Sequence, residues 1–327
     1  VSSPDDDGAI TRRLLMLQRI TFLSELSPAA RIGLAEHAKE RSVSRGQAVP
    51  PSSQGALRFF PDGSACEAHA GAACPGGFAL AAPDLVPWLA EASFDGVVRA
   101  RSDGSMLEVP AADLSAALED EFSLYLAIAS ATARAIVATQ TRTPSISAPA
   151  YRFSGSGTDG PPLTLVDRVL LLRDALPFAR DHVGALVQLA RHATELRCAG
   201  DVELWREGGP ADHALFVLRG SVNAWMGGRN AFTLGPGTAL GGLDVLARSP
   251  RWFTATSAGP LLALVLPVDR FIDVLEDRHE LAREVLRALA RKLLSAWSES
   301  TVGPAAHPAR PPSRRQHQGN VSPVIWK

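Results

Sequence analysis

Residues 204–220 read LWREGGPADHALFVLRG, and this stretch decides the fold. Two short apolar runs flank a turn of glycine and proline, and a second glycine ends the second run. A third run follows at residues 221–226 and stops at Gly227 and Gly228, a pair typical of a hairpin turn. Together these runs predict a meander of short antiparallel strands.

Helical periodicity surrounds the predicted strands. An apolar-rich segment at 165–176 and a helix at 183–195 precede them, and a continuous apolar strand at 261–266 closes the series. Helices are predicted again at 268–275 and 280–297. The last helix carries an apolar stripe that repeats every four residues, formed by Leu281, Val285, Leu289 and Leu293. The order predicts a small antiparallel β-roll flanked by helices.

The first part of the chain resembles the second part in sequence. Residues 34–40 read LAEHAKE, and residues 189–195 read LARHATE, an alignment shifted by 155 positions. Pro110 and the later LED triplet recur at Pro267 and its LED triplet, a shift of 157 positions. Two nearly equal shifts indicate an internal duplication.

We therefore expect an α+β chain, mainly β, with two tandem antiparallel β-roll domains of the jelly-roll or double-stranded β-helix type, each flanked by helices. The expected domains are 10–140 and 164–298. The linker at 141–163 is rich in Ser, Gly and Pro, which cannot bury enough apolar surface to fold. The tail at 299–327 is rich in Pro and Arg, and we expect it to be disordered.

Charge and composition exclude several classes of function. Lys and Arg total 33 and Asp and Glu total 34 among 327 residues, so no positive field attracts DNA or an anionic membrane. We found no run of about 18 uncharged apolar residues and expect no membrane span. The acidic start predicts no signal peptide, and Cys66, Cys74 and Cys198 lack the spacing of a disulfide framework or zinc site. We expect a cytoplasmic protein with no metal and no catalytic residues.

Three stretches together resemble the cyclic nucleotide-binding domain of the catabolite-activator family. They are 204–220, the turn at 234–237, and LGGLDVLARSPR at 240–251, which resembles the phosphate-binding cassette. The resemblance implies a short helix whose backbone N–H groups face a cyclic phosphate, with Arg251 as its charged partner. It also implies a β-roll that encloses the base.

The cassette departs from the family pattern where the ligand would bind. Gly242 replaces the glutamate that accepts the ribose hydroxyl, a loss of about 1–3 kcal/mol. Asp244 either replaces that acceptor or repels the phosphate. Trp252 and Phe253 stand where the family has small side chains, and either fill the phosphate end of the pocket or stack on something larger. The candidate ligand-binding residues are Gly241, Gly242, Leu243, Asp244, Arg251, Trp252 and Thr254.

The equivalent stretch of the first domain shows no such site. After Gly77 no arginine follows until Arg99, and the ribose position has no glutamate. We expect this domain to have kept the fold and lost the ability to bind a ligand.

The leading hypothesis is a regulatory or scaffolding protein that acts through protein contacts, with nucleotide binding weakened or lost. The alternative is a genuine cyclic AMP or cyclic GMP sensor that binds its ligand in the second domain only. Besides such a nucleotide we expect no cofactor. The segment after 298 is too short and too Pro-rich for a DNA-reading domain, and no enzyme is indicated. The stripe at 280–297 either forms a homodimer or packs within its own chain.

Overall fold

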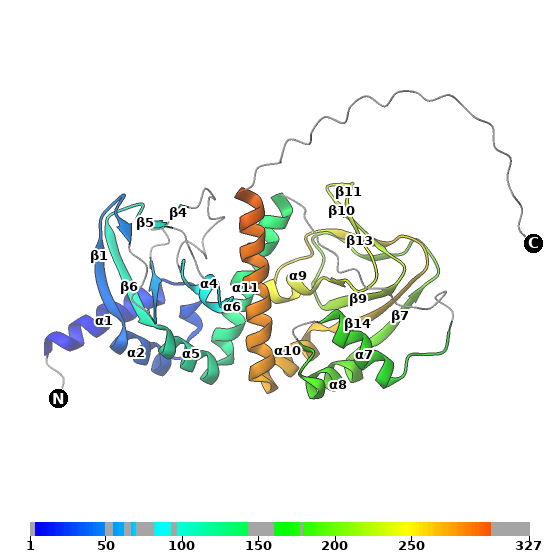
Figure 1. The fold of residues 1–327 in the computed structure, drawn as a ribbon, viewed down its shortest axis with the longest axis horizontal. Helices are drawn as coiled ribbons and strands as arrows, with labels where there is room; N and C mark the ends of the chain where they lie inside the picture. Colours follow the sequence, from blue (N-terminus) through cyan, green and yellow to red (C-terminus); the bar gives the residue numbers. More distant parts are fainter. Residues whose placement is uncertain are drawn as a thin grey trace, which may run out of the picture.

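The computed structural model describes residues 4–49, 55–61, 67–69, 82–92, 97–142, 160–176 and 179–301. It combines helices with antiparallel sheets (Figure 1). We call residues 4–142 the first half and residues 160–301 the second half.

The elements of the first half begin with three helical segments and continue with short strands and three further helices. They are α1 (Pro4–Gln18), η1 (Leu23–Glu25), α2 (Pro28–His37), β1 (Lys39–Val43), β2 (Ala48–Val49), β3 (Ala56–Phe59), β4 (Glu67–His69), α4 (Leu85–Leu89), β5 (Val97–Arg99), β6 (Gly104–Pro110), α5 (Ala111–Asp120) and α6 (Phe122–Arg142).

The second half begins with two helices, continues with strands that include one short helix among them, and ends with two helices. Its elements are α7 (Leu165–Ala175), α8 (Val183–His192), β7 (Thr194–Cys198), β8 (Glu203–Trp205), β9 (His213–Arg219), β10 (Val222–Met226), β11 (Arg229–Leu234), β12 (Ala239–Leu240), α9 (Gly242–Ala247), β13 (Thr254–Ser257), β14 (Leu261–Pro267), α10 (Val268–Asp277) and α11 (His279–Thr301).

Each half holds two antiparallel sheets. The first half has the strand orders β1-β6-β3 and β2-β5-β4, and the second half has β11-β10-β13-β8 and β12-β9-β14-β7. The hairpin predicted at Gly227 and Gly228 joins β10 and β11, with Met226 paired to Arg229. No closed barrel is formed by the strands that the structure describes.

The segments aligned in the sequence form similar elements in the two halves, while the internal duplication itself stays a prediction. Helices α2 and α8 both end at a histidine and are followed by strands that pair with the last strand of their half. Helices α5 and α10 both follow a proline, Pro110 and Pro267, which takes the N-cap position. The aligned segments therefore occupy corresponding places in the two halves.

Helix α8 is shorter than we expected. The sequence predicted a helix through residue 195, but α8 ends at His192 and β7 starts at Thr194. Helical spacing did not mark this end, because pairing with β14 places Thr194 and Glu195 in a strand.

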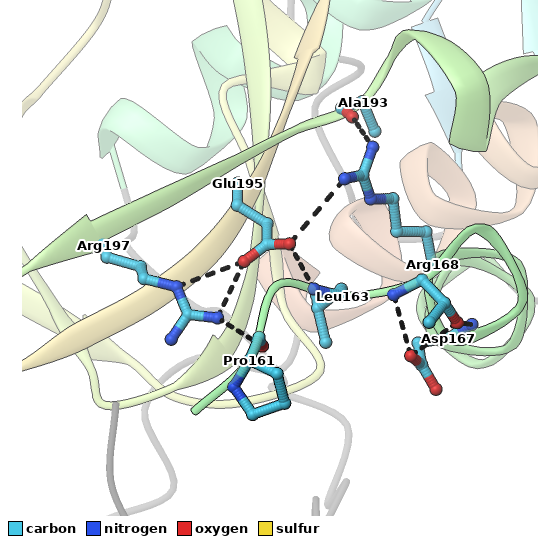
Figure 2. A network of polar contacts seen from close by, with 8 residues as sticks. Pro161, Leu163, Asp167, Arg168, Ala193, Glu195 and Arg197 are labelled. Carbon is cyan, nitrogen blue, oxygen red and sulfur yellow. Dashed lines mark hydrogen bonds and ion pairs between the residues drawn. The ribbon is translucent and has the colours of Figure 1, made fainter. Parts of the chain in front are cut away.

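A polar network fixes the start of α7 to β7 (Figure 2). The Glu195 carboxylate accepts a hydrogen bond from the Leu163 backbone N–H and forms an ion pair with Arg197, 2.8 Å from its Nη2. Arg168 on α7 lies 3.7 Å from the same carboxylate and donates to the carbonyl of Ala193, 2.9 Å away. These contacts place α7 beside the edge strand of its sheet.

Helices α6 and α11 lie side by side between the two halves (Figure 1). One hydrophobic cluster includes Leu124 and Ile128 of α6 together with Leu281, Val285 and Leu293 of α11. The apolar core therefore runs without a break from one half into the other.

The stripe predicted on residues 280–297 is buried within this chain. Leu281, Val285, Leu289 and Leu293 have almost no exposed surface, because α11 packs against α6 and α4 of the first half. The hypothesis of a homodimer formed through this stripe is therefore wrong, and the alternative of packing within the chain is correct.

Residues 122–141 of α6 are long and apolar enough, by length and composition, to cross a membrane, with a mean hydropathy of 1.4. We had expected no such segment. Half of it is buried against the protein, and core helices meet the same criterion. Most of the predicted linker and tail, residues 143–159 and 302–327, lie outside the described residues.

Candidate ligand-binding site

The cassette forms a short helix, α9, that begins next to Gly241. Gly241 has φ +72°, a left-handed conformation that favours glycine. A Cβ at this position would lie 2.2 Å from Nη1 of Arg251. Glycine is therefore required here both by the backbone angle and by the close approach of the arginine.

Arg251 makes its polar contacts within the protein. Its guanidinium donates to the carbonyl oxygen of His213 at 2.6 Å and to that of Gly241 at 3.2 Å. The central guanidinium carbon lies 4.3 Å from the centre of the Trp205 ring, a cation–π contact. The Arg251 side chain has no exposed surface. The residue that resembles the phosphate-binding arginine thus already has protein partners for its charge.

Asp244 is the buried counter-ion of this arginine. Its Oδ2 lies 3.6 Å from Arg251 Nη1, and both side chains are fully buried. Both carboxylate oxygens lack a hydrogen-bond donor among the described residues. Burial raises the pKa of Asp244 to about 7, and the positive charge of Arg251 opposes that rise. Asp244 therefore faces the arginine, and its role as a replacement for the ribose acceptor stays a prediction.

Three aromatic side chains cluster beside the cassette. Phe232 lies 5.7 Å from Trp252 and 5.5 Å from Phe253, measured between ring centres, and Trp252 lies 4.9 Å from Phe253. Such separations are favourable for tilted and edge-to-face contacts. All three rings line a cavity, so the aromatics at 252 and 253 form part of its wall.

This cavity, of about 260 Å³, lies beside α9 and extends to the helices between the two halves. Apolar side chains of strands β9, β11 and β12 and of helices α10 and α11 form most of its wall, Phe216 and Leu289 among them. Gln140, Thr238 and Lys292 add the polar groups. Gln140 belongs to α6, so the first half contributes to a cavity of the second half.

The structure divides the predicted site residues into two groups. Those that line the cavity are Gly241, Gly242, Leu243 and Trp252, and those outside its wall are Asp244, Arg251 and Thr254. The Thr254 hydroxyl accepts a hydrogen bond from the backbone N–H of Glu207 at 3.0 Å, which joins the start of β13 to the turn after β8. The cavity therefore adjoins the cassette without including its arginine.

Sequence reasoning missed the polar residues of the cavity. Lys292 could have been noticed, because Val285, Ala288, Leu289 and Lys292 share a helix face and the lysine interrupts an apolar series. Gln140 gives no local signal, since its position depends on how α6 packs against the second half.

Helix α6 also holds the far end of the cassette helix. The carbonyl oxygen of Ala247, the last residue of α9, accepts hydrogen bonds from the Ser130 hydroxyl at 3.1 Å and from Arg134 Nη1 at 3.3 Å. Because Ser130 is buried, its hydrogen bond is shielded from water. The first half thus fixes α9 in place.

The first half has its own buried arginine. Arg58 on β3 forms two side-chain hydrogen bonds with Asp84, at 2.7 and 2.6 Å, just before α4. The stretch in which we expected no ligand-binding arginine is residues 77–99, of which residues 77–81 and 93–96 lie outside the described residues. Within the described residues, no group of three or more His, Cys, Asp or Glu could hold a metal ion.

Comparison with known proteins finds a family model that matches part of the second half. The family model of the cyclic nucleotide-binding domain matches residues 196–278, from β7 to the end of α10. This part of the chain is similar to cyclic nucleotide-binding domains. No curated protein matches the sequence.

Several solved structures are similar to this chain. The regulatory domain of Toxoplasma gondii PKA with cAMP is 13% identical and matches over 88% of this chain and 98% of its own, with a TM-score of 0.34. The N-terminal domain of a transcriptional regulator from Streptomyces coelicolor is 27% identical over 38% of this chain and 93% of its own, with a TM-score of 0.34. A cyclic nucleotide-binding-like protein from Brucella abortus is 25% identical over 34% and 98%, with a TM-score of 0.31.

Proposed function

We propose that this chain is a regulatory or scaffolding module that acts through protein contacts, and that its cyclic nucleotide-binding domain has lost tight nucleotide binding. The internal use of Arg251 carries this proposal. The guanidinium already donates to two backbone carbonyls and faces a carboxylate, so binding a ligand phosphate would require it to break these contacts.

The energy needed to release Arg251 supports the loss of affinity. A hydrogen bond from a charged group contributes about 1.5–3 kcal/mol, so two such bonds are worth about 3–6 kcal/mol. A cyclic phosphate that recruited the arginine would have to offset this energy. The affinity would then fall by roughly a hundredfold to ten-thousandfold relative to a free arginine.

The surface of the second half supports protein contacts. Leu165, Val166 and Leu170 on α7 are exposed, as are Val183 and Val202. Apolar side chains gathered on one helix are a feature of protein interaction surfaces. Light scattering and affinity capture with the full chain test this part, and a chain that stays a monomer without partners contradicts it.

The second candidate function is a nucleotide sensor, favoured by the cavity that lies directly beside Gly241 and Gly242. Calorimetric titration of the full chain with cyclic AMP and cyclic GMP separates the two functions. We expect no saturable binding in the micromolar range. Micromolar binding that Arg251→Lys abolishes would establish the sensor instead.

A further inference from the structure

The cavity contains two buried polar atoms with no partner. Gln140 and Thr238 are each more than nine-tenths buried, and Gln140 Oε1 and Thr238 Oγ1 form no hydrogen bond with the described residues. A buried polar group without a partner costs about 1–3 kcal/mol. Both residues line the cavity, so a molecule inside it could satisfy them.

The cavity is large for an empty apolar space. Its volume of about 260 Å³ exceeds the roughly 150 Å³ of apolar cavities that take up benzene. Its walls are aromatic and aliphatic, with Phe232, Trp252 and Leu289 among them. Such walls favour a hydrocarbon body over a group of water molecules.

Lys292 supplies a positive charge at this wall. Lys292 is exposed, and it forms no ion pair with a carboxylate of the described part of the chain. The atoms crowded around it lower the pKa of its ammonium group by desolvation. An anionic group on a ligand in the cavity could pair with this ammonium group.

From these features we infer that the cavity binds a medium-chain carboxylic acid. The hydrocarbon chain lies against the aromatic and aliphatic walls, and the carboxylate pairs with Lys292. The Thr238 hydroxyl and the Gln140 amide hydrogen-bond the polar end of the ligand or a water molecule bound to it. The inference rests on the proposed loss of nucleotide binding, because a bound purine would occupy the same space.

Such a ligand would join the two halves of the chain. Gln140 comes from α6 of the first half, Leu243 from the cassette helix α9, and Lys292 from α11. The acid would therefore hold α6, α9 and α11 together and stabilise their arrangement. A small molecule would then regulate the module without contacting Arg251.

Decanoate and octanoate, titrated calorimetrically against the full chain below their micellar concentrations, test the inference. We expect saturable binding with one site and a rise in the melting temperature. Lys292→Met should weaken decanoate binding at least about tenfold and leave binding of the uncharged decanol nearly unchanged. Lys39→Met, at an exposed lysine on β1, is the matched control and should bind as the native chain does.

A second variant keeps the test independent of the charge. Ala288→Leu adds volume to the cavity wall on a helix that tolerates leucine, and it should abolish binding of both decanoate and decanol. No binding of either acid to the native chain overturns the inference, and so does decanoate affinity that Lys292→Met leaves intact.

Cyclic AMP added as a competitor separates this inference from the proposed function. Displacement of bound decanoate by cyclic AMP would place the acid in the nucleotide pocket and contradict the loss of nucleotide binding. Absence of binding by both ligands would contradict the acid site and leave the proposed function standing.

Discussion

Arg251 and Asp244 face each other inside the second half, with 3.6 Å between Nη1 and Oδ2 and no exposed surface on either side chain. Their separation is longer than a hydrogen bond, so the pair is held by charge. The arginine donates its hydrogen bonds to the carbonyl oxygens of Gly241 and His213. This arrangement turns the cassette arginine into a structural residue.

Removal of the arginine should leave a buried charge without compensation. We expect Arg251→Met to lower the free energy of unfolding by about 3–5 kcal/mol at pH 8, because Asp244 is then an unpaired buried carboxylate. Combining it with Asp244→Leu should recover most of the loss. Urea denaturation of the single and double variants measures both effects.

The control for this pair is Arg206→Met. Arg206 is exposed and pairs with Glu203 at the surface, so we expect a change within about 1 kcal/mol. A double variant no more stable than Arg251→Met would show that the charge pair is not what Arg251 stabilises.

The raised pKa of Asp244 predicts a pH-dependent stability. A carboxyl with a pKa of about 7 in the folded chain and about 4 in the unfolded chain takes up a proton on folding between these pH values. The free energy of unfolding should therefore fall as pH rises from about 4 to about 7. Urea denaturation at several pH values should show this decline in the native chain and a flatter profile in Asp244→Asn. Parallel profiles would contradict the assignment.

The two cassette glycines provide a matched comparison. Gly241→Ala forces a left-handed backbone angle on alanine and moves its Cβ into Arg251, so we expect a loss of about 1–3 kcal/mol. Gly242→Ala meets nothing within 4 Å and adds helix propensity at the start of α9, so it should be nearly neutral. Thermal denaturation compares the two, and equal effects would argue against the close contact with the guanidinium.

The contact between α6 and α9 predicts a local change in dynamics. Ser130→Ala removes the hydroxyl that donates to Ala247, which should lower stability by about 0.5–1.5 kcal/mol. Amide hydrogen exchange should become faster in α9. Ser123→Ala, at an exposed serine of the same helix, should leave α9 unchanged. Faster exchange in both variants, or in neither, would show that the first half does not hold the cassette helix through Ser130.

The sequence predicted much of the second half because its signals are local. Glycine pairs mark the turns, as at Gly227, and the apolar runs between them become strands. The prolines at 110 and 267 mark the start of equivalent helices in both halves. These features depend on neighbouring residues and can be read without knowledge of the tertiary structure.

The hydrogen-bond partners of Arg251 could not be predicted from such local signals. Its partners are backbone carbonyls, and no residue type identifies a carbonyl that will accept a hydrogen bond. The burial of Asp244 depends on packing around α9, and the place of Gln140 in the cavity depends on α6, about a hundred residues before the cassette. The apolar stripe of α11 predicted a buried helix face, but it could not decide between a homodimer and packing within the chain, nor identify α6 and α4 as partners.

The most direct test of the central claim is a calorimetric titration of the full chain with cyclic AMP and cyclic GMP, with Arg251→Lys measured alongside. Because Arg251 makes its contacts within the protein, we predict no saturable binding of either nucleotide at micromolar concentration by the native chain or the variant. Saturable micromolar binding by the native chain that disappears in Arg251→Lys would show that the arginine serves a phosphate, and would contradict the account.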